Sequence, residues 1–279
     1  MRKIFFLILI YIYSSSVLAL DKKRIDQDSL MSIKLQKDGI AAGRLGDFEL
    51  ALNNFEQVYR LRQKMFGANS VRLASPLNNI GIQYKNIGNF DKAIEAYKKA
   101  EYLCLNDLGD NNLMLGSIYV NIGNIYRLGG DYNQALEYQK NAYRILRKDS
   151  VKYYLKFQES KYSIAEIQLK LGFNKEAIRF AQSNLKSTSA DLEPSLFDLI
   201  ALAHRNEGDY KLSELNYLNA IKSWIKLYGE DNVELISEYL AYSSFLMSQK
   251  NYEKALLYST KAKSIVLKYY GEKSTTYAE

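Results

Sequence analysis

A short phrase of glycine, an acidic or amide residue and an aromatic residue returns along this chain at a nearly fixed interval. Its first three copies are Gly46-Asp47-Phe48, Gly88-Asn89-Phe90 and Gly130-Asp131-Tyr132. The glycines at 46, 88, 130 and 172 are 42 residues apart, the next step is 36 residues, to 208, and another 42 leads to position 250, which holds a lysine. Self-similarity at a period of this size predicts an array of repeated supersecondary units.

Two further positions of the repeat hold small residues in every copy. Seven residues before the turn they are Gly39, Gly81, Gly123, Ala165, Ala201 and Ser243, and five after it they are Ala51, Ala93, Ala135, Ala177, Ser213 and Ala255. Two residues after the turn the side chain is aromatic in every copy except the fourth, which has Asn174. Small residues let two backbones approach closely, so each unit is expected to be a helix, a tight glycine turn and a second helix packed on the first. The chain is therefore predicted to be all-α.

This pattern resembles the tetratricopeptide repeat, whose usual unit is about 34 residues. The 42-residue interval is similar to the variety found in kinesin light chains and in many bacterial multidomain proteins. A second set of glycines, at 67, 109, 229 and 271, lies 21 residues before the next turn position, where that variety ends its second helix. The resemblance runs from about residue 31 to the end of the chain. It implies a right-handed superhelical solenoid of antiparallel helix pairs, with the first helix of each pair on the inner face.

The resemblance divides the chain into a lead-in at 20–30, six repeats at 31–273 and the start of a truncated seventh repeat at 274–279. The fourth repeat departs from the pattern at Lys161, Gln168, Asn174 and Ala181. The connections at 148–158 and 186–196 lack the second glycine or are short, which predicts an irregularity between the third and fifth repeats. Because arrays normally finish with a capping helix, we expect either a longer protein or an end covered by a partner or a second copy.

The first nineteen residues read as a signal peptide. Met1-Arg2-Lys3 is positively charged, residues 4–13 are an unbroken apolar run, and Val17 and Ala19 fit the small-residue pattern of a cleavage site. A run of ten is too short for a membrane-spanning helix, which needs about 20 residues. We therefore expect export through the secretory pathway to the periplasm or the cell exterior, with cleavage after Ala19. An uncleaved signal that anchors the chain is the alternative.

Composition and motifs argue against catalysis. Removing residues 1–19 leaves 36 of the 38 basic residues against 31 acidic ones, a net charge of +5, which is modest for nucleic-acid binding. Cys104 is the single cysteine and His204 the single histidine, and both are expected to pack between helices. No zinc-protease, paired-cysteine or phosphate-loop motif occurs. We predict no enzyme, no cofactor, no metal and no nucleic-acid partner.

The resemblance implies that an extended peptide lies along the first helices. Asparagines at equivalent places in the second and third repeats would bond to its backbone, since an amide offers both donors and an acceptor. Basic residues recur two or three positions before the turn and favour an acidic or carboxylate-terminated ligand. The alternative is that cations favour the last turn of any helix. The candidate peptide-binding residues are Asn78, Asn79, Lys85, Asn121, Asn124, Arg127, Lys170 and Arg205.

Two function classes follow from the resemblance. The first is an exported scaffold that binds an extended peptide or a partner protein, with self-association through the uncapped C-terminal repeat as a further expectation. The second is the sensing or regulatory N-terminal region of a longer bacterial signalling protein, or of one with a caspase-like protease domain. A chain that continues past Glu279 into an output domain would select the second class.

Overall fold

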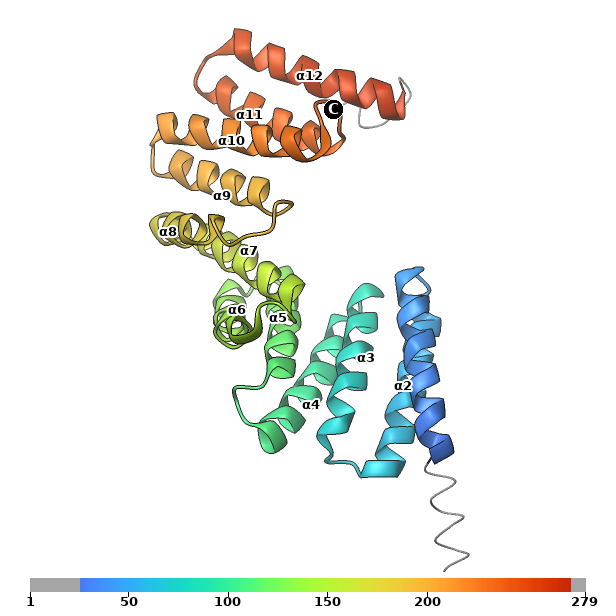
Figure 1. Ribbon diagram of the computed structural model, residues 1–279. Helices are drawn as coiled ribbons and strands as arrows, with labels where there is room; N and C mark the ends of the chain where they lie inside the picture. Colours follow the sequence, from blue (N-terminus) through green and yellow to red (C-terminus); the bar gives the residue numbers. More distant parts are fainter. Residues whose placement is uncertain (1–25, 272–279) are drawn as a thin grey trace, which may run out of the picture. The chain divides into compact units, whose positions relative to one another are not determined.

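The computed structural model describes residues 26–271, and every regular element in that range is a helix (Figure 1). The all-α prediction is confirmed for this range. The predicted signal peptide and the predicted start of a seventh repeat lie outside the described residues. No helix within 26–271 is both long enough and apolar enough to span a membrane.

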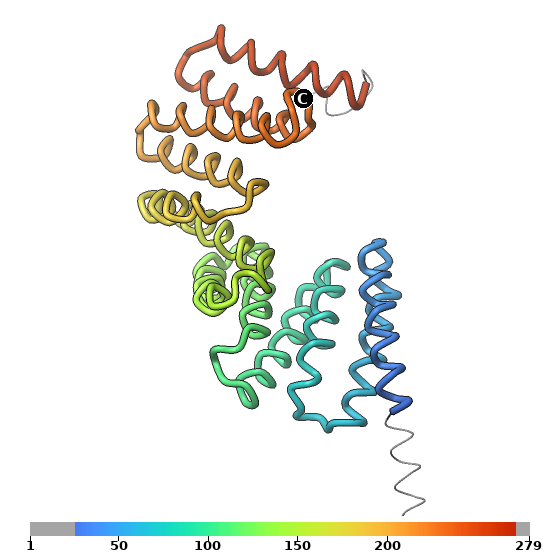
Figure 2. The backbone as a smooth tube through the Cα atoms, viewed as in Figure 1, coloured from blue at the N-terminus to red at the C-terminus, as the bar shows by residue number. Residues whose placement is uncertain are grey.

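The chain divides into two compact units, Met1–Ile125 and Tyr126–Glu279, with the division inside one helix. The first unit contains a leading helix at 26–44, α2 (Phe48–Phe66), the 3₁₀ turn η1 (Val71–Leu73), α3 (Ala74–Asn86), α4 (Phe90–Leu108) and most of α5 (Leu113–Leu128). The second contains the end of α5, α6 (Tyr132–Leu146), η2 (Arg147–Asp149), α7 (Tyr154–Lys170), α8 (Asn174–Leu185), α9 (Glu193–Asn206), α10 (Tyr210–Tyr228), α11 (Glu234–Ser248) and α12 (Tyr252–Tyr270). Within each unit, consecutive helices run as hairpins (Figure 2). The superhelical sense stays a prediction.

The repeated phrase forms the turn inside each pair, as predicted. The five turn glycines have φ between 78° and 86°, a backbone region that residues other than glycine rarely adopt. In the first three copies the next residue caps the second helix: Asp47, Asn89 and Asp131 each accept a hydrogen bond from the backbone N–H three residues on. The sixth copy makes the same turn with Lys250 at φ 59°. The turn is thus retained where its glycine is not.

The small residues mark the contact between the two helices of a pair. A Cβ added to Gly81 would lie 2.5 Å from Cε1 of Tyr97, a fully buried ring on the second helix. In the last two repeats one of the small residues is a serine, and its hydroxyl bonds to the backbone of the other helix of the pair. The Ser213 hydroxyl donates to the Ala201 carbonyl at 2.9 Å, and the Ser243 hydroxyl donates to the Ala255 carbonyl at 2.8 Å. The prediction that these positions pack the pair is confirmed.

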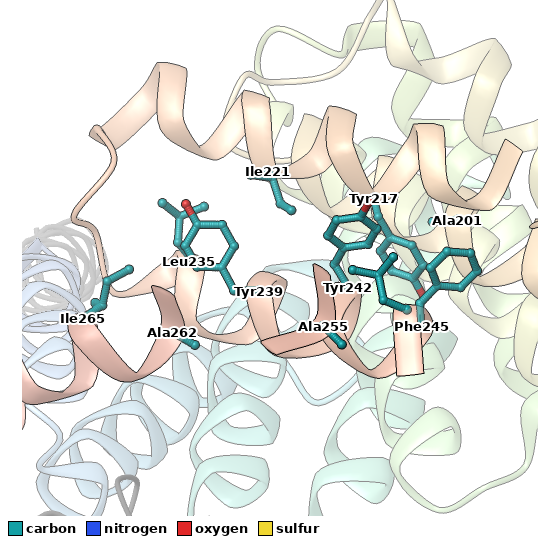
Figure 3. Packing of buried hydrophobic residues seen from close by; sticks show 11 residues of the cluster. Ala201, Tyr217, Ile221, Leu235, Tyr239, Tyr242, Phe245, Ala255, Ala262 and Ile265 are labelled. Carbon is teal, nitrogen blue, oxygen red and sulfur yellow. The ribbon is translucent and has the colours of Figure 1, made fainter. Parts of the chain in front are cut away.

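Aromatic side chains fill the space between successive pairs. In the second unit, Tyr217 from α10 meets Tyr242 and Phe245 from α11, with ring centroids 6.0 and 5.3 Å apart (Figure 3). Ala201 and Ala255 complete the same cluster from the flanking helices. Each pair therefore buries its apolar face against its neighbour, which is how a repeat array obtains a core.

The linkers between pairs also agree with the prediction from the second set of glycines. Gly67, Gly109, Gly229 and Gly271 terminate α2, α4, α10 and α12, each with positive φ. Those four helices have 19 residues, whereas α6 has 15 and α8 has 12. The predicted irregularity between the third and fifth repeats is confirmed. Here Lys161 is buried, and its ammonium donates to the Ser187 carbonyl and hydroxyl at 2.7 and 3.0 Å.

Candidate functional site

The predicted amide residues lie on the first helices of the second and third pairs, α3 and α5. Asn78 and Asn79 are half-buried on α3, whereas Asn121 and Asn124 on α5 are only 3% and 8% exposed. The Asn121 amide donates to Oδ1 of Asn78 at 2.8 Å. The structure therefore joins two of the predicted residues across neighbouring repeats. Their contact with a peptide stays a prediction, and Asn78 and Asn79 are the two of the four that present more surface to a ligand.

The predicted basic residues differ in their surroundings. Arg127, at the end of α5, pairs with Glu166 on α7, with Nη1 3.2 Å from Oε2. Burial raises the pKa of the Tyr217 hydroxyl to about 12, and Arg205, near the end of α9, partly offsets that rise. Lys85 is half-buried and Lys170 is exposed. Arg127 already has a partner within the second unit, so an anionic ligand there would have to compete with Glu166.

A half-buried and a buried acidic side chain, Asp198 and Glu238, lie on first helices of the second unit. Burial raises the pKa of Asp198 on α9 to about 6, and burial together with Asp198 raises that of Glu238 on α11 to about 7. Glu238 Oε1 accepts a hydrogen bond from the Trp224 indole at 3.2 Å. Glu238 Oε2 and Asp198 Oδ1 are buried and have no hydrogen-bond partner among the described residues.

The sequence contained a signal for Glu238, although the sequence analysis did not single it out. It lies twelve residues before the turn position, where the third and fifth repeats have Ile118 and Leu196. Both of those residues are fully buried. The other copies have Lys34, Pro76 and Ser160 at this position, so it is not apolar throughout the array and gives only a weak signal for a buried acid.

The lone histidine and cysteine have the packing positions that the repeat predicts. His204 is 7% exposed, and its Nδ1 lies 3.6 Å from Oδ2 of Asp209. Cys104 is fully buried and unpaired, and burial raises the pKa of its thiol to about 11. Among residues 26–271 no group of His, Cys, Asp or Glu is arranged to hold a metal ion.

Two adjoining hollows of about 360 and 380 Å³ lie on the first unit, over α2, α3 and α4. They share Tyr59 and Leu77 as apolar walls and Glu95 and Lys99 as a charged rim. Glu95 and Lys99 pair with each other at 2.7 Å. The sequence analysis did not predict these hollows, because they depend on how neighbouring second helices stack.

Comparisons with known proteins agree with this geometry. The tetratricopeptide repeat family profile matches residues 39–101 and 72–148. No curated protein sequence matches the chain. Among solved structures, the nearly identical TPR-like repeats of a Podosopora anserina protein described as a kinesin light chain are 14% identical, with a TM-score of 0.60 over 70% of this chain and 94% of that one.

Two other solved structures extend the likeness along the chain. BtubC (BKLC) from P. vanneervenii is 15% identical, with a TM-score of 0.63 over 86% of this chain and 94% of that one. The apo quorum sensor NprR from B. thuringiensis is 17% identical, with a TM-score of 0.64 over 84% of this chain and 65% of that one. At these identities the likeness shows the fold alone. The chain folds as an all-α array of helix pairs similar to tetratricopeptide and kinesin-light-chain repeats, and residues 39–148 match the tetratricopeptide family in sequence as well.

Proposed function

We propose that this chain is an exported interaction scaffold that binds an extended peptide or a partner protein along the first helices of its repeats. The observation that carries the proposal is the amide pair of Asn78 and Asn121, with half-buried Asn79 beside Asn78 in the sequence. The bond between the pair fixes the orientation of both side chains. The side-chain amide of Asn79 offers two N–H donors and one C=O acceptor, which match the C=O and N–H groups of an extended peptide backbone.

The basic candidate residues would give the site a preference for an acidic ligand. Lys85 in the first unit, and Lys170 and Arg205 in the second, are the candidates for contact with acidic side chains or a chain terminus. Arg127 is half-exposed and paired with Glu166, so its role in binding would require that ion pair to rearrange. Self-association through the last repeat is an alternative use of the same scaffold.

Affinity capture tests the scaffold proposal. The purified chain is used as bait, captured proteins are identified by mass spectrometry, and the affinity of one reproducible partner is measured. Asn79→Ala and Lys85→Ala together should weaken that affinity at least about tenfold, the loss expected for one neutral and one charge-assisted hydrogen bond. Glu95→Ala, an exposed change on the second helix of the same pair, is the control. Unchanged affinity in the double variant, with melting also unchanged, would reject this face as the binding site.

A sensing role in a longer protein is the second candidate. The similarity to NprR favours it, because that structure is described as a quorum sensor and this chain covers 65% of it. An array that changes its partner affinity on binding a small ligand would support this function, and one whose partner affinity is the same with and without the ligand would not.

Export is part of the first proposal and has its own test. It depends on the charged and apolar segments of residues 1–19. Cell fractionation with N-terminal sequencing should find a chain that begins at Leu20 outside the cytoplasm. An intact Met1 on a membrane-bound chain would indicate an uncleaved anchor instead.

A further inference from the structure

A third hollow in the first unit has a different chemical character. It has a volume of about 320 Å³ and opens between the leading helix, α2, η1, α3 and the first turn of α5. Two arginines, three serines and five apolar side chains line it: Arg62, Arg72, Ser29, Ser32, Ser75, Ile33, Met65, Phe66, Val71 and Met114. No acidic residue is among them. We call it the Arg62 pocket.

Three hydrogen bonds hold the Arg62 guanidinium in place. Its Nε donates to the Ser32 hydroxyl at 3.2 Å, its Nη1 donates to the Arg72 carbonyl at 3.3 Å, and its Nη2 donates to Oε1 of Gln36. A guanidinium has five N–H donors, so one on each terminal nitrogen remains for another acceptor. The group is therefore fixed in orientation but not saturated.

The second guanidinium lies at the same pocket. The Arg72 guanidinium carbon is 4.3 Å from the centroid of the Phe66 ring, so the side chain is held against an aromatic face. Burial and the neighbouring Arg72 charge lower the pKa of Arg62. Within residues 26–271 no carboxylate forms an ion pair with either arginine, and two acids of this region have other partners. Asp28 pairs with Lys64 at 2.8 Å, and Asp107 accepts from the Val71 N–H at 3.1 Å.

Two like charges, one of them partly desolvated, destabilise the pocket in its present form. An anion bound between them would remove the repulsion and occupy the unused donors. Guanidinium groups match carboxylate and phosphate oxygens in a two-pronged geometry, which a lysine ammonium does not provide. The volume is within the range of small-molecule sites, and the apolar residues of the lining suit an uncharged remainder of the ligand.

We propose that the Arg62 pocket binds a small anionic ligand, a carboxylate or phosphate group on an apolar body. The anion would lie between Arg62 and Arg72, with the Ser29 and Ser75 hydroxyls as further donors. The apolar body would pack on Met65 and Met114. This site is separate from the proposed peptide-binding residues and would serve as the place where the array receives a small-molecule signal or cargo.

Calorimetric titration of the purified chain tests the proposal with four probes of similar size: hexanoate, hexyl phosphate, hexanamide and hexylamine. One of the two anions should bind saturably and at least about tenfold more tightly than hexanamide, because charge-assisted hydrogen bonds are the stronger ones. Hexylamine should not bind. Which anion binds better distinguishes a carboxylate site from a phosphate site. Equal binding of hexanoate, hexyl phosphate and hexanamide, or no saturable binding of either anion below about 10 mM, overturns the proposal.

Variants locate the site. Arg72→Gln should weaken anion binding at least about tenfold while the melting temperature stays near its original value, because this arginine is exposed. Arg62→Lys keeps the charge but loses the planar fork, so it should also weaken binding even where Arg62→Gln fails to fold. Arg179→Gln removes the same charge from α8 in the other unit and is the control. An affinity that is unchanged in Arg72→Gln, or lowered equally in Arg179→Gln, would show that the anion binds elsewhere.

Discussion

The sixth turn offers a direct measurement of what a positive φ costs in this array. Lys250 has φ 59°, and the glycine at the matching place in the fifth repeat, Gly208, has φ 83°. The hydrogen bonds of the two turns correspond: the Lys250 N–H donates to the Met247 carbonyl at 3.0 Å, and the Gly208 N–H donates to the Arg205 carbonyl at 3.1 Å. Lys250→Gly therefore changes the conformational preference of one residue and leaves the turn in place.

The magnitude follows from two opposing effects. A left-handed conformation costs a residue with a Cβ about 1–2 kcal/mol, and glycine loses about 0.5–1 kcal/mol more backbone entropy on folding. Lys250→Gly should therefore raise the free energy of unfolding by about 0.5–1 kcal/mol. Gly88→Ala is the reverse change. A Cβ added there would meet nothing within 4 Å, so its cost is conformational and not steric, and the loss should be of similar size.

Urea denaturation followed by circular dichroism, with native-state hydrogen exchange of the α11 and α12 amides, provides the assay. Hydrogen exchange is needed because repeat arrays can unfold in parts, and an overall midpoint then mixes several transitions. Lys250→Ala is the matched control, since it removes the charge and the long side chain but keeps the Cβ. If Lys250→Ala stabilises α11 and α12 as much as Lys250→Gly, the strain argument is refuted and the lysine charge is responsible.

Three other perturbations test the packing and the electrostatics. Gly81→Ala and Ala93→Leu should each cost about 1–3 kcal/mol through overpacking, whereas Glu95→Leu on the exposed face should shift the denaturant midpoint little. Because the pKa of Glu238 is raised from 4.5 to about 7, the native state retains a proton that the unfolded state releases. The free energy of unfolding should then fall, by up to about 3 kcal/mol, as pH rises from about 4.5 to about 7, and Glu238→Gln should flatten this dependence. A double-mutant cycle on Arg127 and Glu166 should give a coupling of about 0.5–1 kcal/mol, and zero coupling would show that the ion pair does not hold the two repeats together.

The structural features that the sequence predicted are those that only one or two residue types can form. A turn with φ near 80° selects glycine, and a close contact like that of the Gly81 backbone with the Tyr97 ring disfavours any larger residue. These requirements return once per repeat, so the period reveals them. The same reasoning located the irregularity between the third and fifth repeats, where the glycine that ends α2 and α4 has no counterpart after α6 and α8. That α6 and α8 are short was not predicted.

The polar contacts between repeats could not be predicted in the same way. Asn121 bonds to Asn78, 43 residues earlier, and Arg127 pairs with Glu166, 39 residues later. Both contacts depend on side-chain rotamers and on the register of neighbouring pairs, which the repeat period does not determine. The Arg62 pocket is formed partly by the leading helix and by η1, where no repeated phrase marks the residues.

Two charged residues on first helices of the second unit are buried, and their surroundings differ. Lys161 is 1% exposed, but its ammonium donates to a carbonyl and a hydroxyl of Ser187 and lies 4.7 Å from the centroid of the Phe157 ring. Glu238 is 9% exposed and has a partner on only one carboxyl oxygen. A buried polar atom without a hydrogen bond costs about 1–3 kcal/mol, and the cost is greater for a charge. The charge of Lys161 is thus satisfied by hydrogen bonds within its own repeat. Glu238 keeps one carboxyl oxygen without a hydrogen bond, so its protonation makes the stability of the second unit sensitive to pH.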